Sequence, residues 1–182
     1  KSNLTDEQNS YYIARKRMIE EQLRPEIHDQ RVLDAMAKVP RDRFVPHALE
    51  GQAYSDHPLN IGEGQTISQP LIVAMMTEQM QLKGDEKILE IGTGSGYQCA
   101  ILCELCKKVY SIERITSLSN RARRALYDMG YVNFSLRIGD GTKGWPEEAP
   151  FDRIIVTAGA PVVPEELQRQ LRRGGRLIIP VG

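Results

Sequence analysis

A short apolar run, a cluster of glycines and an apolar helix follow one another directly within Lys87–Leu105. The run Lys87–Ile91 is typical of a buried strand, and three glycines occur in the next five residues, 92–96. Glycines suit such a junction because the chain must turn tightly and let a ligand approach backbone N–H groups without a Cβ in the way. In open α/β sheets ligands bind beyond the carboxyl ends of strands. The segment therefore predicts a strand–loop–helix unit that holds a ligand.

Strands and helices continue to alternate after this unit. Gly130 is expected to end one later helix, and Gly174–Gly175 another. Such alternation predicts a parallel sheet with helices on both faces. The fold class is thus α/β, a doubly wound, mostly parallel, Rossmann-like sheet of five strands with a helical N-terminal extension. The further strands are expected at Val109–Ile112, Phe134–Ile138, Arg153–Thr157 and Arg176–Val181, and the helices at Tyr97–Leu105, Leu118–Met129 and Glu165–Leu171.

The N-terminal part is expected to be helical and then irregular. Apolar spacing predicts helices at Glu7–Leu23 and Gln30–Val39, each stopped by a proline. Prolines and glycines recur from Arg41 to Pro70 and exclude long helices there. A loop of this length inside a compact domain tends to be functional. A third helix is expected at Leu71–Gln81, leading into the sheet.

Length and charge limit the possible functions. The chain has 182 residues, and its 24 Lys and Arg balance its 24 Asp and Glu. This length suits one domain, with residues 1–70 forming N-terminal helices and a loop and residues 71–182 forming the α/β core. Zero net charge disfavours a nucleic-acid partner. No apolar stretch approaches the roughly 20 residues that span a bilayer, and the first residues lack a signal peptide's apolar core, so no membrane partner is expected.

The spacing of the glycines separates two classes of cofactor. Dinucleotide-binding enzymes prefer G-x-G-x-x-G, whereas this chain has G-x-G-x-G followed by Tyr97. Together with Glu90, the segment E-x-G-x-G-x-G resembles the signature of the class I methyltransferases, which bind S-adenosyl-L-methionine. An NAD-dependent dehydrogenase remains the alternative. The resemblance implies that Glu90 organises the loop and the methionine end of the cofactor, and that the loop residues Gly92, Thr93, Gly94 and Gly96 bind it.

Two more acidic residues follow at the ends of later strands. Glu113 lies about 20 residues after the first glycine, the spacing at which a carboxylate accepts hydrogen bonds from ribose hydroxyls. The alternative is an exposed acid paired with Arg114. By the resemblance, Asp140 and Gly141 contact the adenine, although an ordinary Asp-Gly turn is the alternative. Three carboxylates at successive strand ends favour a cofactor site.

Cys99, Cys103 and Cys106 lie close together. An odd number at this spacing forms no disulfide framework and suits a reducing compartment, so a cytoplasmic protein is expected. The spacing also matches the iron–sulfur ligands of radical S-adenosylmethionine enzymes. However, the three positions share one face of a predicted helix, and Leu105 stands where those enzymes commonly have an aromatic residue. We therefore expect core packing and no metal.

The methyl acceptor is indicated by a different segment. Gly64–Pro70 closely resembles the substrate-loop signature of the protein-L-isoaspartate O-methyltransferases. From the residues alone, Ser68 could equally cap a helix with Pro70 in its first turn. Other segments match the same family in the family's order. They are Val39–Pro46, the glycine loop with Tyr97-Gln98, Phe151–Ala158 and Gly174–Gly182.

The resemblance implies a reaction and a set of residues for it. The family transfers a methyl group from S-adenosyl-L-methionine to the α-carboxylate of L-isoaspartyl residues in damaged proteins, and the ester collapses to a succinimide that begins repair. It implies that Ser68 is catalytic and donates a hydrogen bond to the carboxylate. Gln65 and Thr66 line the same substrate pocket, and Ile67 closes over the cofactor.

General acid–base catalysis is not expected. A carboxylate with a pKa of about 4 is already ionised at neutral pH and needs no base, and none of His28, His47 and His57 has an obvious acidic partner. A small-molecule methyltransferase and a non-catalytic binding module are the remaining alternatives. Because members of this family usually continue past the fifth strand, their C-terminal strands are expected to be missing from this sequence.

Overall fold

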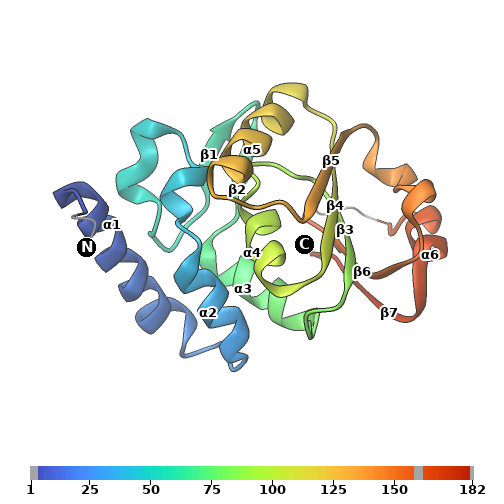
Figure 1. Cartoon of the computed structure of the whole chain (residues 1–182), viewed down its shortest axis with the longest axis horizontal. Helices are drawn as coiled ribbons and strands as arrows, with labels where there is room; N and C mark the ends of the chain where they lie inside the picture. The colour runs from blue at the N-terminus through green and yellow to red at the C-terminus, as the bar shows by residue number, and fades with distance from the viewer. Residues whose placement is uncertain (1–3, 158–161, 181–182) are drawn as a thin grey trace.

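The computed structural model describes residues 4–157 and 162–180. At its centre lies a parallel sheet whose strand order is β5-β4-β3-β6-β7 (Figure 1). The predicted α/β fold with a parallel sheet is thus confirmed. The strands are β3 (Lys87–Ile91), β4 (Lys108–Glu113), β5 (Phe134–Ile138), β6 (Phe151–Val156) and β7 (Leu171–Ile178).

The direction in which strands are added reverses at β3. The chain adds β4 and β5 on one side of β3 and then β6 and β7 on the other. Ile91, the last residue of β3, consequently pairs with Ile112 of β4 and with Val156 of β6. Such a switch point leaves a crevice outside the carboxyl ends of the central strands. The glycine loop begins at this crevice.

Helices cover the two faces of the sheet unequally. Because side chains alternate along a strand, Ile88 and Ile155 point into a large core, whereas Leu89 and Ile154 point into a smaller one. The large core includes residues of α3 (Pro70–Gln79), α4 (Tyr97–Leu105) and α5 (Thr116–Asp128), and the smaller core includes Leu167 of α6 (Glu165–Gln170). Gly130, with φ +84°, follows α5 and ends it as predicted.

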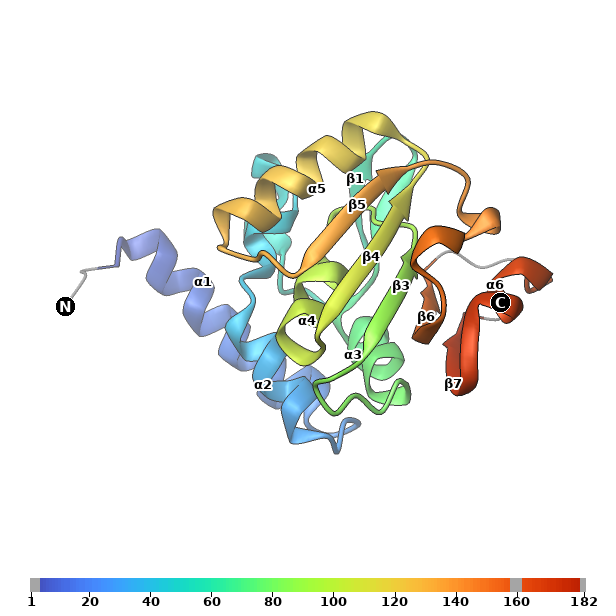
Figure 2. The same cartoon turned by 45° about the vertical axis from the view of Figure 1, so that its right-hand side comes forward.

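The N-terminal helices share the large core. Glu7–Leu23 was predicted as one helix, and the structure has α1 (Asp6–Arg17) continuing into a π-helix, η1 (Met18–Leu23). The structure describes every residue of α1, and none of their side chains is buried. The helix extends away from the sheet (Figure 2). The π-helix buries Met18, Ile19 and Leu23. The next helix, α2 (Gln30–Lys38), agrees with the prediction to within one residue.

The irregular region contains an unpredicted hairpin. After two 3₁₀ turns, η2 (Arg41–Phe44) and η3 (His47–Gln52), β1 (Leu59–Gly62) pairs antiparallel with β2 (Gln65–Ile67). The two-residue turn has positive φ at both positions, 56° at Glu63 and 68° at Gly64, as a type I′ turn requires. The strands are only four and three residues long, and Glu precedes the glycine where Asn or Asp is usual. These features hid the hairpin from the sequence analysis.

The predicted boundary between the last helix and strand was wrong. Gly174–Gly175 was expected to close a helix ending at Leu171, but α6 ends at Gln170 and both glycines lie inside β7. They accommodate a register shift, because Leu171 pairs with Phe151 and the next pair joins Arg176 to Arg153. A Cβ on Gly175 would lie 2.8 Å from the Asp152 carbonyl oxygen, so a larger residue would not fit. Val181 of the predicted strand, and Ala158 and Gly182 of the matching segments, lie outside the described residues.

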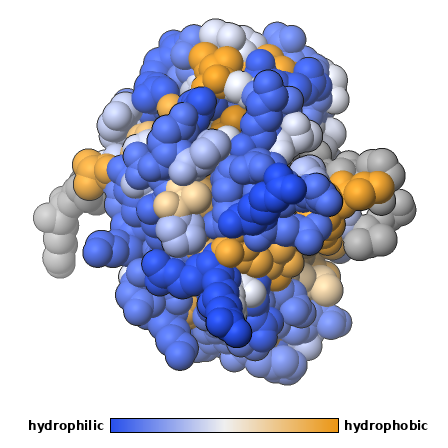
Figure 3. Space-filling model, turned by 90° about the vertical axis from the view of Figure 1, so that its right-hand side faces the viewer, coloured by the Kyte–Doolittle hydropathy of each residue, from blue (hydrophilic) through white to orange (hydrophobic). Residues whose placement is uncertain are grey.

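The surface beside β7 is mostly hydrophilic, with an apolar strip across it (Figure 3). Leu177 of β7 and Ile179 just beyond it are partly buried against the smaller core. Among the helices of the described ranges, none has the length and apolar character that crossing a membrane requires.

Candidate active site

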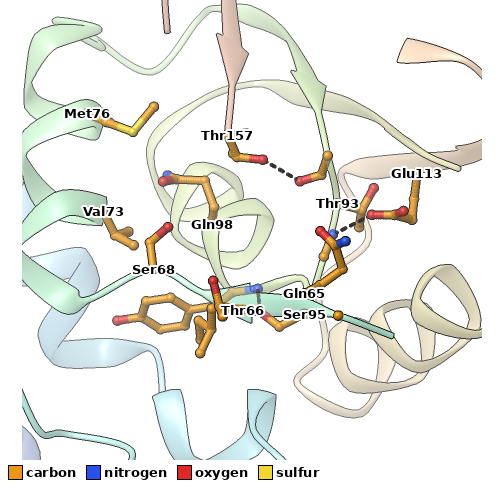
Figure 4. Close-up of a pocket in the computed structure, with 15 residues that line it drawn as sticks. Gln65, Thr66, Ser68, Val73, Met76, Thr93, Ser95, Gln98, Glu113 and Thr157 are labelled. Atoms are coloured by element: carbon orange, nitrogen blue, oxygen red, sulfur yellow. Dashed lines mark hydrogen bonds between the residues drawn. The ribbon is translucent and has the colours of Figure 1, made fainter. Parts of the chain in front are cut away.

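A cavity at the carboxyl end of the sheet brings the two predicted loops together (Figure 4). The hairpin contributes Gly64–Ser68, the glycine loop contributes Gly92–Ser95, and Glu113 ends β4 beside them. In the view of Figure 4, Ser68 and Glu113 lie on opposite sides of the cavity. The remaining lining residues are Val73 and Met76 of α3, Tyr97 and Gln98 of α4, and Thr157.

The glycine loop has a backbone that other residues rarely adopt. Gly92, Gly94 and Gly96 have φ values of +96°, +54° and +89°. A Cβ on Gly92 would lie 2.5 Å from Thr157 Oγ1, and one on Gly96 would lie 3.1 Å from the Cβ of Ala122 in α5. Because Gly92 has no Cβ, the loop can lie close to Thr157, the residue after β6. Because Gly96 has none, the start of α4 can pack against α5. Gly96 itself does not line the cavity.

The Glu113 carboxylate binds the loop. It is buried, with 6% of its surface exposed, so the alternative of an exposed acid paired with Arg114 is wrong. Its Oε1 accepts the Gly94 N–H at 2.9 Å, and its Oε2 accepts the Ile115 N–H at 2.9 Å. Each carboxylate oxygen keeps a second lone pair for a ligand. Glu113 can thus hold the loop in shape and, at the same time, accept a hydrogen bond from a ligand hydroxyl in the cavity.

Glu90 lies beneath the loop and does not line the cavity. It is fully buried, and its Oε1 accepts a hydrogen bond of 2.6 Å from Ser111 Oγ. Ser111 Oγ is in turn 2.6 Å from Thr93 Oγ1, so a polar chain links Glu90 to the loop. No described residue bonds Glu90 Oε2. Burial, reinforced by the nearby charge of Glu113, raises the pKa of Glu90 to about 8.

The residues predicted to contact adenine, Asp140 and Gly141, lie outside the cavity lining. Asp140 caps the 3₁₀ turn η4 (Gly141–Lys143), and its Oδ1 accepts bonds from the Thr142 hydroxyl at 2.7 Å and backbone N–H at 3.0 Å. The bonds from Thr142 lower the pKa of Asp140. A Cβ on Gly141 would lie 2.3 Å from Ile91 Cγ2. This turn is therefore packed against the residue that precedes the glycine loop.

The three predicted substrate residues, Gln65, Thr66 and Ser68, all line the cavity, and so does Ile67, which was predicted to contact the cofactor. All four lie on or just after β2. The alternative that Ser68 caps α3 is wrong, because the N-cap is Gln69 and Pro70 occupies the first turn. The Ser68 hydroxyl turns toward the cavity (Figure 4), while its carbonyl accepts a 2.9 Å hydrogen bond from Arg41 Nη2.

Several lining residues were not predicted from the sequence. Gln98 Nε2 donates to Thr77 Oγ1 at 2.9 Å and so joins α4 to α3. Thr157 Oγ1 donates to the carbonyls of Ile91 and Gly92, at 3.0 and 2.9 Å. Thr157 ends a predicted strand at the ligand-binding edge, which could have identified it. Val73 and Met76 reach the cavity through the packing of α3, and no local pattern reveals that, whereas Gln98 belongs to a segment that resembles the family.

The histidines lie outside the cavity lining. His47 does have an acidic partner, contrary to the sequence prediction, since its Nδ1 is 3.2 Å from Glu50 Oε1. The two residues are three apart in η3, and the His47 side chain is 91% exposed. Such a pair is a surface contact of little energetic weight.

The three cysteines are buried within the large core, which confirms their predicted packing role. The Cys103 thiol and burial raise the pKa of Cys99, and burial with the nearby Cys103 raises the pKa of Cys106. Within residues 4–157 and 162–180, no group of three or more His, Cys, Asp or Glu side chains could hold a metal ion.

Comparison with known proteins gives consistent matches. A family model described as protein-L-isoaspartate(D-aspartate) O-methyltransferase matches residues 14–182. The protein-L-isoaspartate O-methyltransferase 1 of Syntrophobacter fumaroxidans is 61% identical over 170 residues, which cover 93% of this chain and 79% of that protein. The protein-L-isoaspartate O-methyltransferase of Geobacter metallireducens is 60% identical over 174 residues, covering 95% and 81%.

Two solved structures are similar to more than nine-tenths of this chain. One protein-L-isoaspartate O-methyltransferase is 31% identical with a TM-score of 0.81, and the match covers 91% of this chain and 55% of that one. A Plasmodium falciparum protein of the same description, solved in complex with S-adenosyl-L-homocysteine, is 26% identical with a TM-score of 0.80. That match covers 92% of this chain and 84% of the other.

Proposed function

Because this chain belongs to the protein-L-isoaspartate(D-aspartate) O-methyltransferase family, we propose that methyl transfer takes place in the cavity between the hairpin and the glycine loop. The enzyme uses S-adenosyl-L-methionine to methylate L-isoaspartyl residues in damaged proteins, which begins their repair through a succinimide. One observation carries the proposed location. The segment resembling the substrate loop and the segment resembling the cofactor loop line the same cavity.

The residues of the cavity fit the cofactor. Gly92 and Gly94 present backbone without a side chain, and the Thr93 hydroxyl is bonded to Ser111 in the interior. The Glu113 carboxylate beside them can accept hydrogen bonds from ribose hydroxyls. Ile67 supplies an apolar contact from the hairpin. The other proposed cofactor residues act from outside the lining: Glu90 and Gly96 shape the loop, and Asp140 and Gly141 form the adjacent turn.

Ser68 is proposed to bind the carboxylate that accepts the methyl group. S-adenosyl-L-methionine, when bound, supplies an electrophilic methyl group on a sulfonium. The Ser68 hydroxyl donates a hydrogen bond that orients the substrate carboxylate, and Gln65 and Thr66 line the space around it. The carboxylate is ionised at neutral pH, so these residues need only orient it and exclude water.

The proposed reaction is tested with paired peptides. Methyl groups labelled in S-adenosyl-L-methionine should pass to an isoaspartyl peptide and not to the same peptide with normal aspartate. S-adenosyl-L-homocysteine should compete with the cofactor. Equal labelling of both peptides, or of neither, would contradict the substrate assignment.

We also propose a cytoplasmic protein that works without nucleic-acid, membrane or metal partners. Three unpaired buried thiols suit a reducing compartment. A formal net charge of zero argues against a nucleic acid, whose phosphate backbone attracts basic proteins, as a partner.

We further propose that residues 1–182 form one domain. In support, the large core combines Met18 and Leu23 of the N-terminal helices with Ile88 and Ile155 of the sheet.

A further inference from the structure

Arg41 is a buried cation that the proposed mechanism leaves unused. Arg41 belongs to η2, and none of its surface is exposed. It is among the largest fully buried side chains of the described residues. Burial lowers the pKa of Arg41, yet a guanidinium stays protonated in proteins. A positive charge in this position needs an explanation, because removing it from water is costly.

An ion pair does not explain the position of Arg41. Within the described ranges no carboxylate oxygen lies within 4 Å of its guanidinium. The adjacent Asp42 instead accepts a 2.6 Å hydrogen bond from Tyr54 and lies 4.0 Å from Arg15. The partners of Arg41 are therefore dipoles and an aromatic ring rather than an opposite charge.

These partners join three separate segments. Arg41 Nε donates to the Ala53 carbonyl at 2.6 Å, and Nη2 donates to the Ser68 carbonyl at 2.9 Å. The guanidinium also lies over the ring of Tyr97, 5.0 Å from its centroid. Tyr97 is the first residue of α4, directly after the glycine loop. Arg41 thus fixes the peptide group of Ser68 relative to the helix that follows the cofactor loop.

We propose that Arg41 is a positioning residue for methyl transfer. By holding the Ser68 carbonyl on the core side, it keeps the hydroxyl of the same residue turned into the cavity. Charged donors form the stronger hydrogen bonds, and the rigid planar fork of Arg fixes the directions of two acceptors at once, whereas the compact ammonium of Lys on its flexible stem does not. This inference rests on the proposed role of Ser68.

The test is a double-mutant cycle with Arg41→Lys and Ser68→Ala. Arg41→Lys should lower kcat/KM for an isoaspartyl peptide about 10- to 100-fold, the size expected for a misplaced contact, while the Kd for S-adenosyl-L-homocysteine changes less than about twofold. In the Ser68→Ala background the same substitution should reduce kcat/KM less than about threefold, because the contact through which it acts is already gone.

A control matched in its hydrogen-bond acceptors, although it is exposed where Arg41 is buried, separates positioning from the loss of carbonyl bonds in general. Arg31 also donates to two backbone carbonyls, those of Leu82 and Leu105, but the latter lies at the far end of α4. Arg31→Lys should lower thermal stability without changing kcat/KM more than about twofold. If Arg41→Lys does not fold, Arg41→Gln, which retains an N–H donor, replaces it in the same cycle.

The outcomes distinguish the two assignments. Unchanged turnover in Ser68→Ala would remove the proposed role of Ser68, and the inference about Arg41 with it. A clear loss in Ser68→Ala, combined with an Arg41 effect of equal size in both backgrounds, would overturn the inference about Arg41 alone. So would a loss of S-adenosyl-L-homocysteine affinity that parallels the loss of turnover.

Discussion

Gly92 and Thr157 meet so closely that a Cβ on the glycine would lie 2.5 Å from the threonine Oγ1. Thr157 Oγ1 also donates to the Gly92 carbonyl at 2.9 Å. The glycine loop after β3 is therefore shaped by the residue that follows β6, its neighbour across the switch point.

Gly92→Ala should destabilise the protein and weaken cofactor binding. The new methyl group would clash with Thr157, and a residue with a Cβ is strained at φ +96°. Backbone strain of this kind costs about 1–3 kcal/mol. Urea unfolding and calorimetric titration with S-adenosyl-L-homocysteine measure the two effects. Adding Thr157→Ala should restore part of the stability by removing the clash; a double variant no better than Gly92→Ala would contradict this origin.

Ser68→Ala should lower kcat/KM for an isoaspartyl peptide about 10- to 100-fold, the range expected for one hydrogen bond to a charged group. The Kd for S-adenosyl-L-homocysteine should stay within about twofold, since the serine is assigned to the substrate. Ser135→Ala, on β5 and outside the cavity lining, serves as the control. Full activity in Ser68→Ala would remove the assignment.

Glu113→Ala should weaken S-adenosyl-L-homocysteine binding by about tenfold or more. The substitution removes the acceptor of the Gly94 and Ile115 N–H groups as well as the proposed ribose contact. Glu147→Gln, an exposed acid paired with Arg137, is the control for charge alone. If the peptide KM rises while cofactor affinity is retained, Glu113 belongs to the substrate site instead.

Glu90 should make the stability of the free enzyme depend on pH. Its pKa is about 8 in the fold, against an ordinary value of 4.5 for a glutamate side chain. Between these values the folded state holds a proton that the unfolded state has released, so stability falls as pH rises. Glu90→Gln removes this dependence, so the stability of the variant relative to wild type should rise by up to about 1.4 kcal/mol per pH unit between pH 5 and 8. Urea unfolding at unit steps of pH measures it, and parallel profiles would show that Glu90 does not titrate there.

The sheet was predictable from the sequence because its signals are local. Apolar runs such as Lys87–Ile91 mark buried strands, and glycines mark the turns that follow them. The β1–β2 hairpin was missed because its turn depends on a positive φ at Glu63, a conformation that non-glycine residues rarely adopt. The boundary before β7 was misplaced because a glycine pair can end a helix or accommodate a register shift, and only the pairing with β6 decides between them.

The cavity was predictable where a motif supplies the backbone. Gly92, Gly94 and Glu113 follow from spacing, and Ser68 from resemblance. Met76 reaches the cavity through the packing of α3 against α4, which joins residues about 20 positions apart and leaves no local pattern; Gln98 lay in a segment resembling the family, but its bond to Thr77 of α3 could not be read from the sequence. The partners of Arg41 are likewise set by tertiary packing, because its acceptors lie 12 and 27 residues away.

The two bonds of Glu113 have a consequence for the rate of cofactor binding. Since the bonds that hold Gly94 and Ile115 come from a carboxylate of the protein itself, the conformational entropy of the loop is expected to be lost largely when the chain folds rather than when the cofactor arrives. Association should then follow a single exponential phase whose rate rises linearly with cofactor concentration, with no slower phase for loop closure.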